Sequence, residues 1–275
     1  MPCLACGFNG ERPLYPGIES CPVCRFAWAN LSLTVKEWQD IYSREYFFGK
    51  EYVDYLNEES ALRKNFRRNL SWMKRFCSGG RLLEVGCAYG FFLDESRRYY
   101  SVSGVDLHED GCRYAREKFN VEARAGDFLN MPFEERSLDA VVMWDVLEHL
   151  PRPDLFLQKS SLLLKKGGYL FFSTLDITSL LARIQGHRWR QIHPPTHVSY
   201  FSWQSLKVML AAAGFRVVER KYYGDFRSWD NTLFNLCVLR GKNKYFYNKL
   251  KRSGWLKGDY YLNTFDHVYG ACVRI

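Results

Sequence analysis

The 275-residue sequence contains no run of about 18 uncharged apolar residues, the length that a membrane-spanning helix needs. Its first residues, M-P-C-L-A-C, also lack the basic segment and apolar core of a secretory signal. From these two absences we expect a protein without a transmembrane segment, located in the cytoplasm. Hydrophobic residues still make up 47% of the chain and aromatic residues 17%, which predicts a folded α/β core with room for one small accessory unit.

A complete dinucleotide-binding fingerprint is also missing. Residues 82–90, L-L-E-V-G-C-A-Y-G, have the pattern of a strand that ends in a turn of small residues, but bulky Phe91 stands where the fingerprint requires its third glycine. The pattern that is present, E-x-G-x-A-x-G from Glu84 to Gly90, resembles motif I of class I S-adenosylmethionine-dependent methyltransferases. Ala88 stands in place of the middle glycine, and alanine suits this turn only if its backbone does not need a positive φ.

Later segments extend the resemblance, which covers residues 80–224 and, more weakly, the C-terminus. A second strand ends at Asp106, a third run leads to Asp127, and residues 138–150 form an apolar strand that turns acidic. The resemblance implies an α/β Rossmann-like sheet of seven strands whose last strand, here 266–275, is antiparallel. It also implies that S-adenosyl-L-methionine binds at the strand ends. The residues assigned to this cofactor are Glu84, Gly86, Cys87, Ala88, Gly90, Asp106, Leu107, Asp127, Phe128 and Asp145.

Four of the nine cysteines form two C-x2-C pairs that are separated by fourteen residues. This spacing is typical of a tetrahedral zinc site, in which each turn directs two thiolates at one ion. A redox C-x-x-C motif is the alternative interpretation, but it would need only one pair. We expect a structural Zn²⁺, because four thiolates leave no open coordination position. The predicted ligands are Cys3, Cys6, Cys21 and Cys24.

The predicted domain organisation has three parts. A zinc-binding knuckle covers residues 1–30, and an aromatic connector with a basic helix covers 31–80. The methyltransferase domain covers 81–275 and contains an insertion at 225–265 between its last two strands. The knuckle is too small to bury a core of its own, so its folding is expected to depend on the metal.

The connector carries two further expectations. Apolar residues recur at helical spacing around the basic segment 63–75, which predicts an amphipathic helix with a solvated basic outer face. In relatives of the resembled family, a tyrosine-rich stretch before motif I closes over the cofactor. Tyr42, Tyr46 and Phe47 are therefore candidates for a lid, with plain aromatic packing as the alternative.

Two histidines compete for the role of catalytic base. His197 lies in I-H-P-P-T-H-V-S-Y-F-S, which looks like the loop of NDP-sugar C-methyltransferases that carries a Glu-His pair. Here Thr196 replaces the acid, which disfavours C-methylation in particular. A neutral imidazole can accept a hydroxyl proton near pH 7, so we expect His197 to be the base, with bracing of the loop as the alternative. His149 follows Glu148 in a D-x-x-E-H pattern, where a positioning role is more usual.

The formal net charge of +9 and the sequence pI of about 9.0 favour an anionic partner. The layout is similar to that of sugar and O-antigen biosynthesis methyltransferases. We therefore expect transfer to an O or C atom of a small molecule, a sugar or glycolipid precursor such as a nucleotide-sugar or lipid-linked sugar. The alternatives are an rRNA or tRNA methyltransferase, whose partner is nucleic acid, and a non-catalytic cofactor-binding protein.

The insertion alternates cations with aromatic residues. Such a pattern suits a phosphate-bearing acceptor or peripheral contact with a membrane surface, with a solvated helix as the alternative. The cations are Arg240, Lys242, Lys244, Lys249, Lys251, Arg252 and Lys257.

Overall fold

The computed structural model describes residues 2–31, 55–241, 243–254 and 256–275. Its main element is a seven-stranded sheet in the order β10-β13-β8-β7-β4-β5-β6. The strands are β4 (Arg81–Val85), β5 (Ser101–Asp106), β6 (Glu122–Ala125), β7 (Leu138–Trp144), β8 (Leu164–Leu175), β10 (Phe215–Tyr222) and β13 (His267–Arg274). β13 is antiparallel to both of its neighbours, and the pairings from β8 to β6 are parallel. The predicted Rossmann-like fold class, with an antiparallel last strand, is confirmed.

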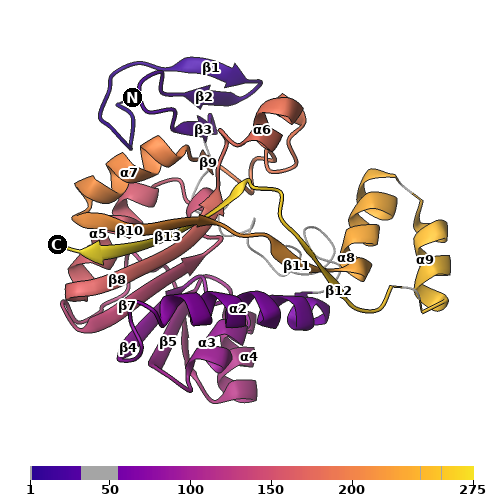
Figure 1. The fold of residues 1–275 in the computed structure, drawn as a ribbon, viewed down its shortest axis with the longest axis horizontal. Coiled ribbons are helices and arrows are strands. Elements are labelled where there is room, and N and C mark those ends of the chain that lie inside the picture. The colour runs from indigo at the N-terminus through magenta and orange to yellow at the C-terminus, as the bar shows by residue number, and fades with distance from the viewer. Residues whose placement is uncertain (1, 32–54, 242, 255) are drawn as a thin grey trace.

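Helices cover both faces of the main sheet (Figure 1). One face carries α2 (Glu59–Met73), α3 (Phe91–Ser96) and α4 (Glu109–Phe119), and the other carries α5 (Pro153–Leu163) and α7 (Trp203–Ala212). Successive side chains of a strand point to opposite faces. Leu82 therefore packs in one core cluster with Trp72 and Phe171. Leu83 packs in the other cluster with Leu157.

The helix predicted at 63–75 is α2, and its basic side is not simply solvated. The Arg63 side chain is only 15% exposed and forms ion pairs with Asp94 and Glu95, both at 2.8 Å. Arg68, 17% exposed, donates hydrogen bonds to the Tyr269 hydroxyl and to a backbone carbonyl. The expected solvated basic face is therefore wrong for these two arginines, because they tie α2 to α3 and β13.

The N-terminal unit, residues 2–31, is a small antiparallel sheet of β1 (Arg12–Tyr15), β2 (Ile18–Ser20) and β3 (Ala27–Ala29). A strand from the methyltransferase-like part of the chain, β9 (Ser199–Tyr200), pairs with β3 and completes this sheet. Phe26 is fully buried, and its ring centroid lies 5.4 Å from that of Phe201. The N-terminal unit therefore shares its core with the face of the main sheet that carries α7.

The segment between β8 and α7 contains α6 (Leu180–Gln185), η4 (Gly186–Arg188) and β9. α7 has a local signal at each end: the Ser202 side chain accepts a hydrogen bond from the Ser205 amide, and Gly214 follows the helix with a φ of 84°. None of the described helices is both long and apolar enough to cross a membrane. The lid candidates Tyr42, Tyr46 and Phe47 lie outside the described residues.

Between β10 and β13 the chain forms an arm, residues 225–262. It consists of β11 (Asp225–Ser228), α8 (Trp229–Phe234), the π-helix η5 (Asn235–Arg240), α9 (Lys244–Arg252) and β12 (Asp259–Leu262). β11 and β12 pair with each other, and the Phe226 amide donates to Asn65 of α2 at 2.8 Å. Figure 1 shows α8 and α9 at the far end of this arm, away from the main sheet.

Candidate active site

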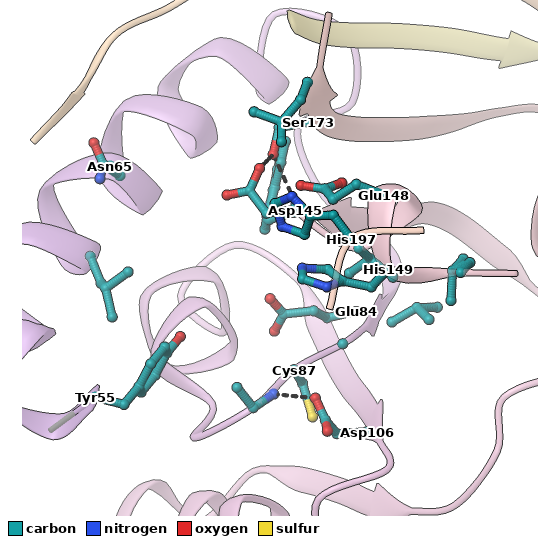
Figure 2. A pocket seen from close by; sticks show the side chains of 18 of the residues that line it. Tyr55, Asn65, Glu84, Cys87, Asp106, Asp145, Glu148, His149, Ser173 and His197 are labelled. Atoms are coloured by element: carbon teal, nitrogen blue, oxygen red, sulfur yellow. Dashed lines mark hydrogen bonds between the residues drawn. The ribbon is translucent and has the colours of Figure 1, made fainter. Parts of the chain in front are cut away.

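A cavity of about 680 Å³ opens where the parallel strands of the main sheet end. The carboxyl ends of parallel strands meet at one edge, so residues that follow β4, β5 and β7 come together there. Among the predicted site residues, those that line the cavity are Glu84, Gly86, Cys87, Ala88, Asp106, Leu107, Asp127, Phe128, Asp145, His149 and His197. In Figure 2, Glu84 lies between Asp106 and the two histidines, and Tyr55 of η2 (Tyr55–Glu58) lies across the cavity.

The turn after β4 contradicts one expectation. Ala88 has a φ of 44°, so the position does need a left-handed backbone even though alanine occupies it. Its amide donates to Asp106 Oδ2 at 2.8 Å, and Asp106 Oδ1 accepts from the His108 amide at 2.9 Å. These charge-assisted hydrogen bonds offset the steric cost of alanine and fix the Asp106 carboxylate at the edge of the cavity.

The two glycines of the motif have different tasks. Gly86 lines the cavity with a φ of 79°, and a Cβ there would lie 2.5 Å from Val146 Cγ2. Gly90 is not among the lining residues; a Cβ on it would lie 2.5 Å from the Ala115 side chain. Gly90 therefore allows α3 to pack closely against α4, and it supports the site without contacting the cavity.

Glu84 is a buried acid that faces the cavity. Its side chain is 3% exposed, and Oε2 has no hydrogen-bond partner among the described residues. Burial raises the pKa of Glu84 well above its usual value, and the Asp106 charge adds to this effect. Leaving a buried polar atom without a partner costs about 1 to 3 kcal/mol. The position therefore suits a ligand that brings a hydrogen-bond donor or a positive charge, such as the amino group of S-adenosylmethionine.

Glu148, His149 and His197 form a compact cluster on the same side of the cavity as Asp145 (Figure 2). Each offers a nitrogen or carboxylate oxygen within 4.8 Å of those of the other two. The ring centroids of His149 and His197 lie 4.7 Å apart. Glu148, from a different element, thus places a carboxyl group close to His197, which Thr196 does not.

Burial governs the protonation of this cluster. It raises the pKa of Glu148 to about 8, and the negative charge of Asp145 adds to the effect. It lowers the pKa of His149 to about 4. It also holds the pKa of His197 well below its usual value, with His149 and His193 contributing in the same direction. Both imidazoles are therefore neutral at pH 7.

Sequence reasoning missed a charged network at the base of the arm. His267 Nε2 lies 2.5 Å from Asp145 Oδ1, and His267 Nδ1 lies 2.8 Å from Asp225 Oδ2. The Tyr269 hydroxyl donates to Asp225 Oδ1 at 3.0 Å. Burial alone would lower the pKa of His267, but the charges of Asp145 and Asp225 outweigh it and hold this pKa well above its usual value. His267 is therefore an imidazolium that joins β7, β11 and β13.

Comparison with known proteins identifies the family. A sequence profile described as a methyltransferase domain matches residues 55–220. The chain belongs to this methyltransferase family. Solved structures with the same fold include a SAM-dependent methyltransferase from Archaeoglobus fulgidus, 24% identical, with a TM-score of 0.55 over 80% of this chain and 99% of that one. Another is magnesium protoporphyrin IX methyltransferase from Synechocystis, solved with bound SAH, 14% identical, with a TM-score of 0.55 over 86% and 98% of the two chains.

Curated relatives of this chain are more similar in sequence but match over shorter regions. A fatty-acid O-methyltransferase of Mycolicibacterium smegmatis is 34% identical over 34% of this chain and 37% of its own length. A ubiquinone biosynthesis O-methyltransferase of Albidiferax ferrireducens is 31% identical over 39% and 46% of the two chains. A phthiotriol/phenolphthiotriol dimycocerosates methyltransferase of Mycobacterium ulcerans is 30% identical over 42% and 46%. The chain thus spans less than half of the length of these relatives.

The N-terminal unit of the chain brings the four predicted zinc ligands together. Sγ of Cys3 lies 3.5 Å from that of Cys24, and Sγ of Cys6 lies 3.6 Å from that of Cys21. Two thiolates bound tetrahedrally to Zn²⁺ at about 2.3 Å lie about 3.8 Å apart, so the spacing fits this ion. Amides of Gly7 and Arg25 close the two C-x2-C turns by donating to the carbonyls of Cys3 and Cys21, at 2.8 and 3.0 Å. The donor set fits a closed, structural zinc site.

Proposed function

We propose that this protein transfers a methyl group from S-adenosylmethionine to an oxygen atom of a small molecule. The observation that carries the proposal is that one cavity joins the strand-end acids of β4 and β5 to the cluster of Glu148, His149 and His197. Family membership supports methyl transfer. The names of relatives that act as O-methyltransferases support oxygen as the receiving atom.

Within this proposal the cofactor supplies the reactive methyl group, and the chain's own residues bind and orient the reactants. Glu84 would hold the positively charged methionine end, because it has a buried acceptor atom without a partner among the described residues. Asp106 would accept hydrogen bonds from the ribose, and Asp127 would lie at the adenine edge. The hydroxyl proton of the acceptor would leave on the side of His197 and His149.

The acceptor is proposed to have both a hydroxylated and an apolar part, as a glycolipid or lipid-linked sugar precursor has. The part of the cavity lining that comes from α2 and the arm supports this, because it combines Leu62, Phe66 and Phe226 with the polar side chains of Asn65 and Asn231. The relatives named for fatty-acid and ubiquinone chemistry also point to acceptors with long apolar portions.

The test is a methyl-transfer assay with radiolabelled S-adenosylmethionine and three acceptor classes: hydroxylated lipids, nucleotide-sugars and ribosomal or transfer RNA. We expect label in the lipid or sugar fraction. Label in RNA alone would favour the alternative of an RNA methyltransferase. Calorimetric binding of the cofactor without transfer to any class would favour a non-catalytic cofactor-binding protein, and absence of cofactor binding would overturn the proposal.

A further inference from the structure

A second candidate metal site lies inside the active-site cavity. In the described part of the chain, two groups of side chains have the composition and spacing to hold an ion: the four cysteines, and the cluster of Glu148, His149 and His197. From this geometry we propose that Glu148, His149 and His197 bind a divalent metal ion that engages the acceptor's hydroxyl. This inference rests on the proposed function for its role, but not for the existence of the site.

The spacing of the donor atoms is the first argument. All three lie within 4.8 Å of one another. Donors bound tetrahedrally to one ion at about 2.1 Å lie about 3.4 Å apart, so each donor needs to move by no more than about 1 Å to coordinate the same ion. Two imidazoles and one carboxylate are the ligand set that zinc and divalent iron commonly use in sites with open positions.

The surroundings of the donor atoms are the second argument. His197 Nδ1 lies 2.9 Å from the Gln191 carbonyl oxygen, and His149 Nδ1 lies 3.0 Å from the Thr196 carbonyl oxygen. A backbone carbonyl accepts from the protonated ring nitrogen, so each Nδ1 carries the proton and each Nε2 has the lone pair that a metal requires. Metal-bound histidines are usually oriented by such a second partner.

The carboxylate is oriented in the same way. The Thr174 hydroxyl donates to Glu148 Oε2 at 2.7 Å. The segment that carries His197 is joined to the segment that carries Glu148 by two further bonds: Val198 N donates to the Glu148 carbonyl at 2.9 Å, and Ser199 Oγ donates to the Leu150 carbonyl at 2.7 Å. The three donors are therefore held in place before any ion binds, which lowers the cost of binding.

The position of the site indicates what a bound ion would do. Glu148, His149 and His197 line the same cavity as Glu84 and Asp106, so an ion held there has an open side toward the reactants. A hydroxyl bound to a divalent ion loses its proton more readily, as metal-bound water does. The proton passes to solvent, the oxygen forms a bond to the methyl carbon, and the sulfur keeps the electrons of the broken S–CH3 bond. In this scheme His197 acts as a ligand and not as the proton acceptor.

The experiment uses the full chain with its cysteine site loaded with zinc and adds Co²⁺ as the probe. We expect one equivalent of Co²⁺ to give weak visible bands typical of nitrogen and oxygen ligands, without the intense thiolate charge-transfer band of a cysteine site. His197→Ala and Glu148→Gln should each weaken Co²⁺ binding by at least about 10- to 100-fold, because the loss of a residue that only supports a ligand already costs that much. His187→Ala, which removes an exposed histidine of the same segment, should leave binding unchanged.

Zinc content and S-adenosylmethionine affinity, measured on every variant, show whether it is folded. Absence of cobalt binding to the wild-type chain would overturn the inference, and so would equal binding by folded Glu148→Gln. Full methyl transfer after a chelator has stripped the second ion would also overturn it while leaving the proposed function intact. Cobalt binding without cofactor binding would leave the metal site standing and overturn the proposed function.

Discussion

At the scale of single residues, the cavity depends on carboxylates that hydrogen bonds hold in place. Asp106 accepts hydrogen bonds from the amides of Ala88 and His108, so the same side chain shapes the turn after β4 and presents its charge to the cavity. Asp145 is similarly held by the Ser173 hydroxyl, at 2.7 Å, and by His267. A substitution at either position removes a charge and a structural bond together.

Asp106→Ala should weaken S-adenosylmethionine binding by about 1 to 3 kcal/mol, because one charged hydrogen-bond acceptor is lost. Isothermal titration calorimetry measures this directly. The matched control is Asp110→Ala, which removes an exposed aspartate four positions away and should leave the affinity unchanged. If both variants bind the cofactor as tightly as the wild type does, the ribose does not contact Asp106.

His267 predicts a pH dependence of stability. The pKa of His267 is raised in the folded state, so protonated His267 stabilises the fold. This contribution to the free energy of unfolding is fully present below the unfolded-state pKa of about 6.5 and is lost as the pH rises through the folded-state pKa. The charged and titratable groups around it are Asp145, Asp225, Tyr269, Arg68 and Glu148. His267→Gln should therefore destabilise the protein more at pH 6 than at pH 10.

Urea denaturation of both proteins at the two pH values tests this prediction. The quantity to compare is the difference in free energy of unfolding between the wild type and the variant, because the titration of groups elsewhere in the chain affects both proteins equally and cancels in this difference. A difference that stays constant across the range would mean that His267 is not held as an imidazolium.

The network around His267 also shows what sequence patterns leave out. Asp145 could be predicted as a site residue because it follows an apolar strand. Asp225 and His267 could not, because they lie 42 residues apart and meet Asp145 only when β11 and β13 are in place. Ala88 was misjudged for a related reason: its left-handed backbone is stabilised by Asp106, a partner from the next strand.

At the scale of elements, the contact between the N-terminal unit and α7 shows how the cysteine-containing unit is attached to the main domain. Ser202 caps α7 by accepting from the Ser205 amide, and its hydroxyl also donates to the Cys24 carbonyl at 2.8 Å. One residue therefore begins a helix of the main domain and contacts the chain at a predicted zinc ligand. The cap was predictable from the sequence, since serine before a helical apolar pattern is a local signal. The contact with Cys24 was not, because it spans 178 residues.

Ser202→Ala should lower the free energy of unfolding by about 1 to 2 kcal/mol, the upper part of the range for a lost N-cap, because a second hydrogen bond is lost with it. Thermal or chemical denaturation measures the change. Ser71→Ala, an exposed serine within α2, serves as the control and should change stability far less. Equal effects of the two substitutions would show that the cap and its contact with Cys24 contribute little.

At the scale of the whole molecule, the main sheet was predictable because each parallel strand is an apolar run ending in a small or acidic residue. The arm was predictable only as an insertion. In the structure, α8 lines the cavity through Asn231 and Thr232, whereas α9 packs on α8 and η5 outside it. Lys251 pairs with Asp230 at 2.8 Å, so part of the predicted basic surface serves to hold α9 against α8.

The exposed cations of α9 are the remaining candidates for contact with an anionic acceptor. Replacing Lys249 and Arg252 with glutamine should raise the Michaelis constant for such an acceptor and flatten its salt dependence, because two attractive charges are removed. Cofactor affinity should not change. Lys118→Gln with Lys166→Gln removes the same charge from exposed positions outside the arm and controls for net charge. Identical kinetics in both double variants would mean that α9 is only a solvated surface.

The pairing of β3 with β9 connects the predicted zinc site to the cavity through one short segment of the chain. β9 begins two residues after His197, so one short segment contains both a side chain that lines the cavity and the strand that pairs with the N-terminal unit. We expect zinc binding and acceptor binding to be coupled through this segment, and coupled equilibria change each other's affinity by the same factor in both directions. Competition with a chromogenic chelator should therefore show a lower zinc dissociation constant when an acceptor is bound. The acceptor should bind more weakly, by that same factor, once the zinc has been removed.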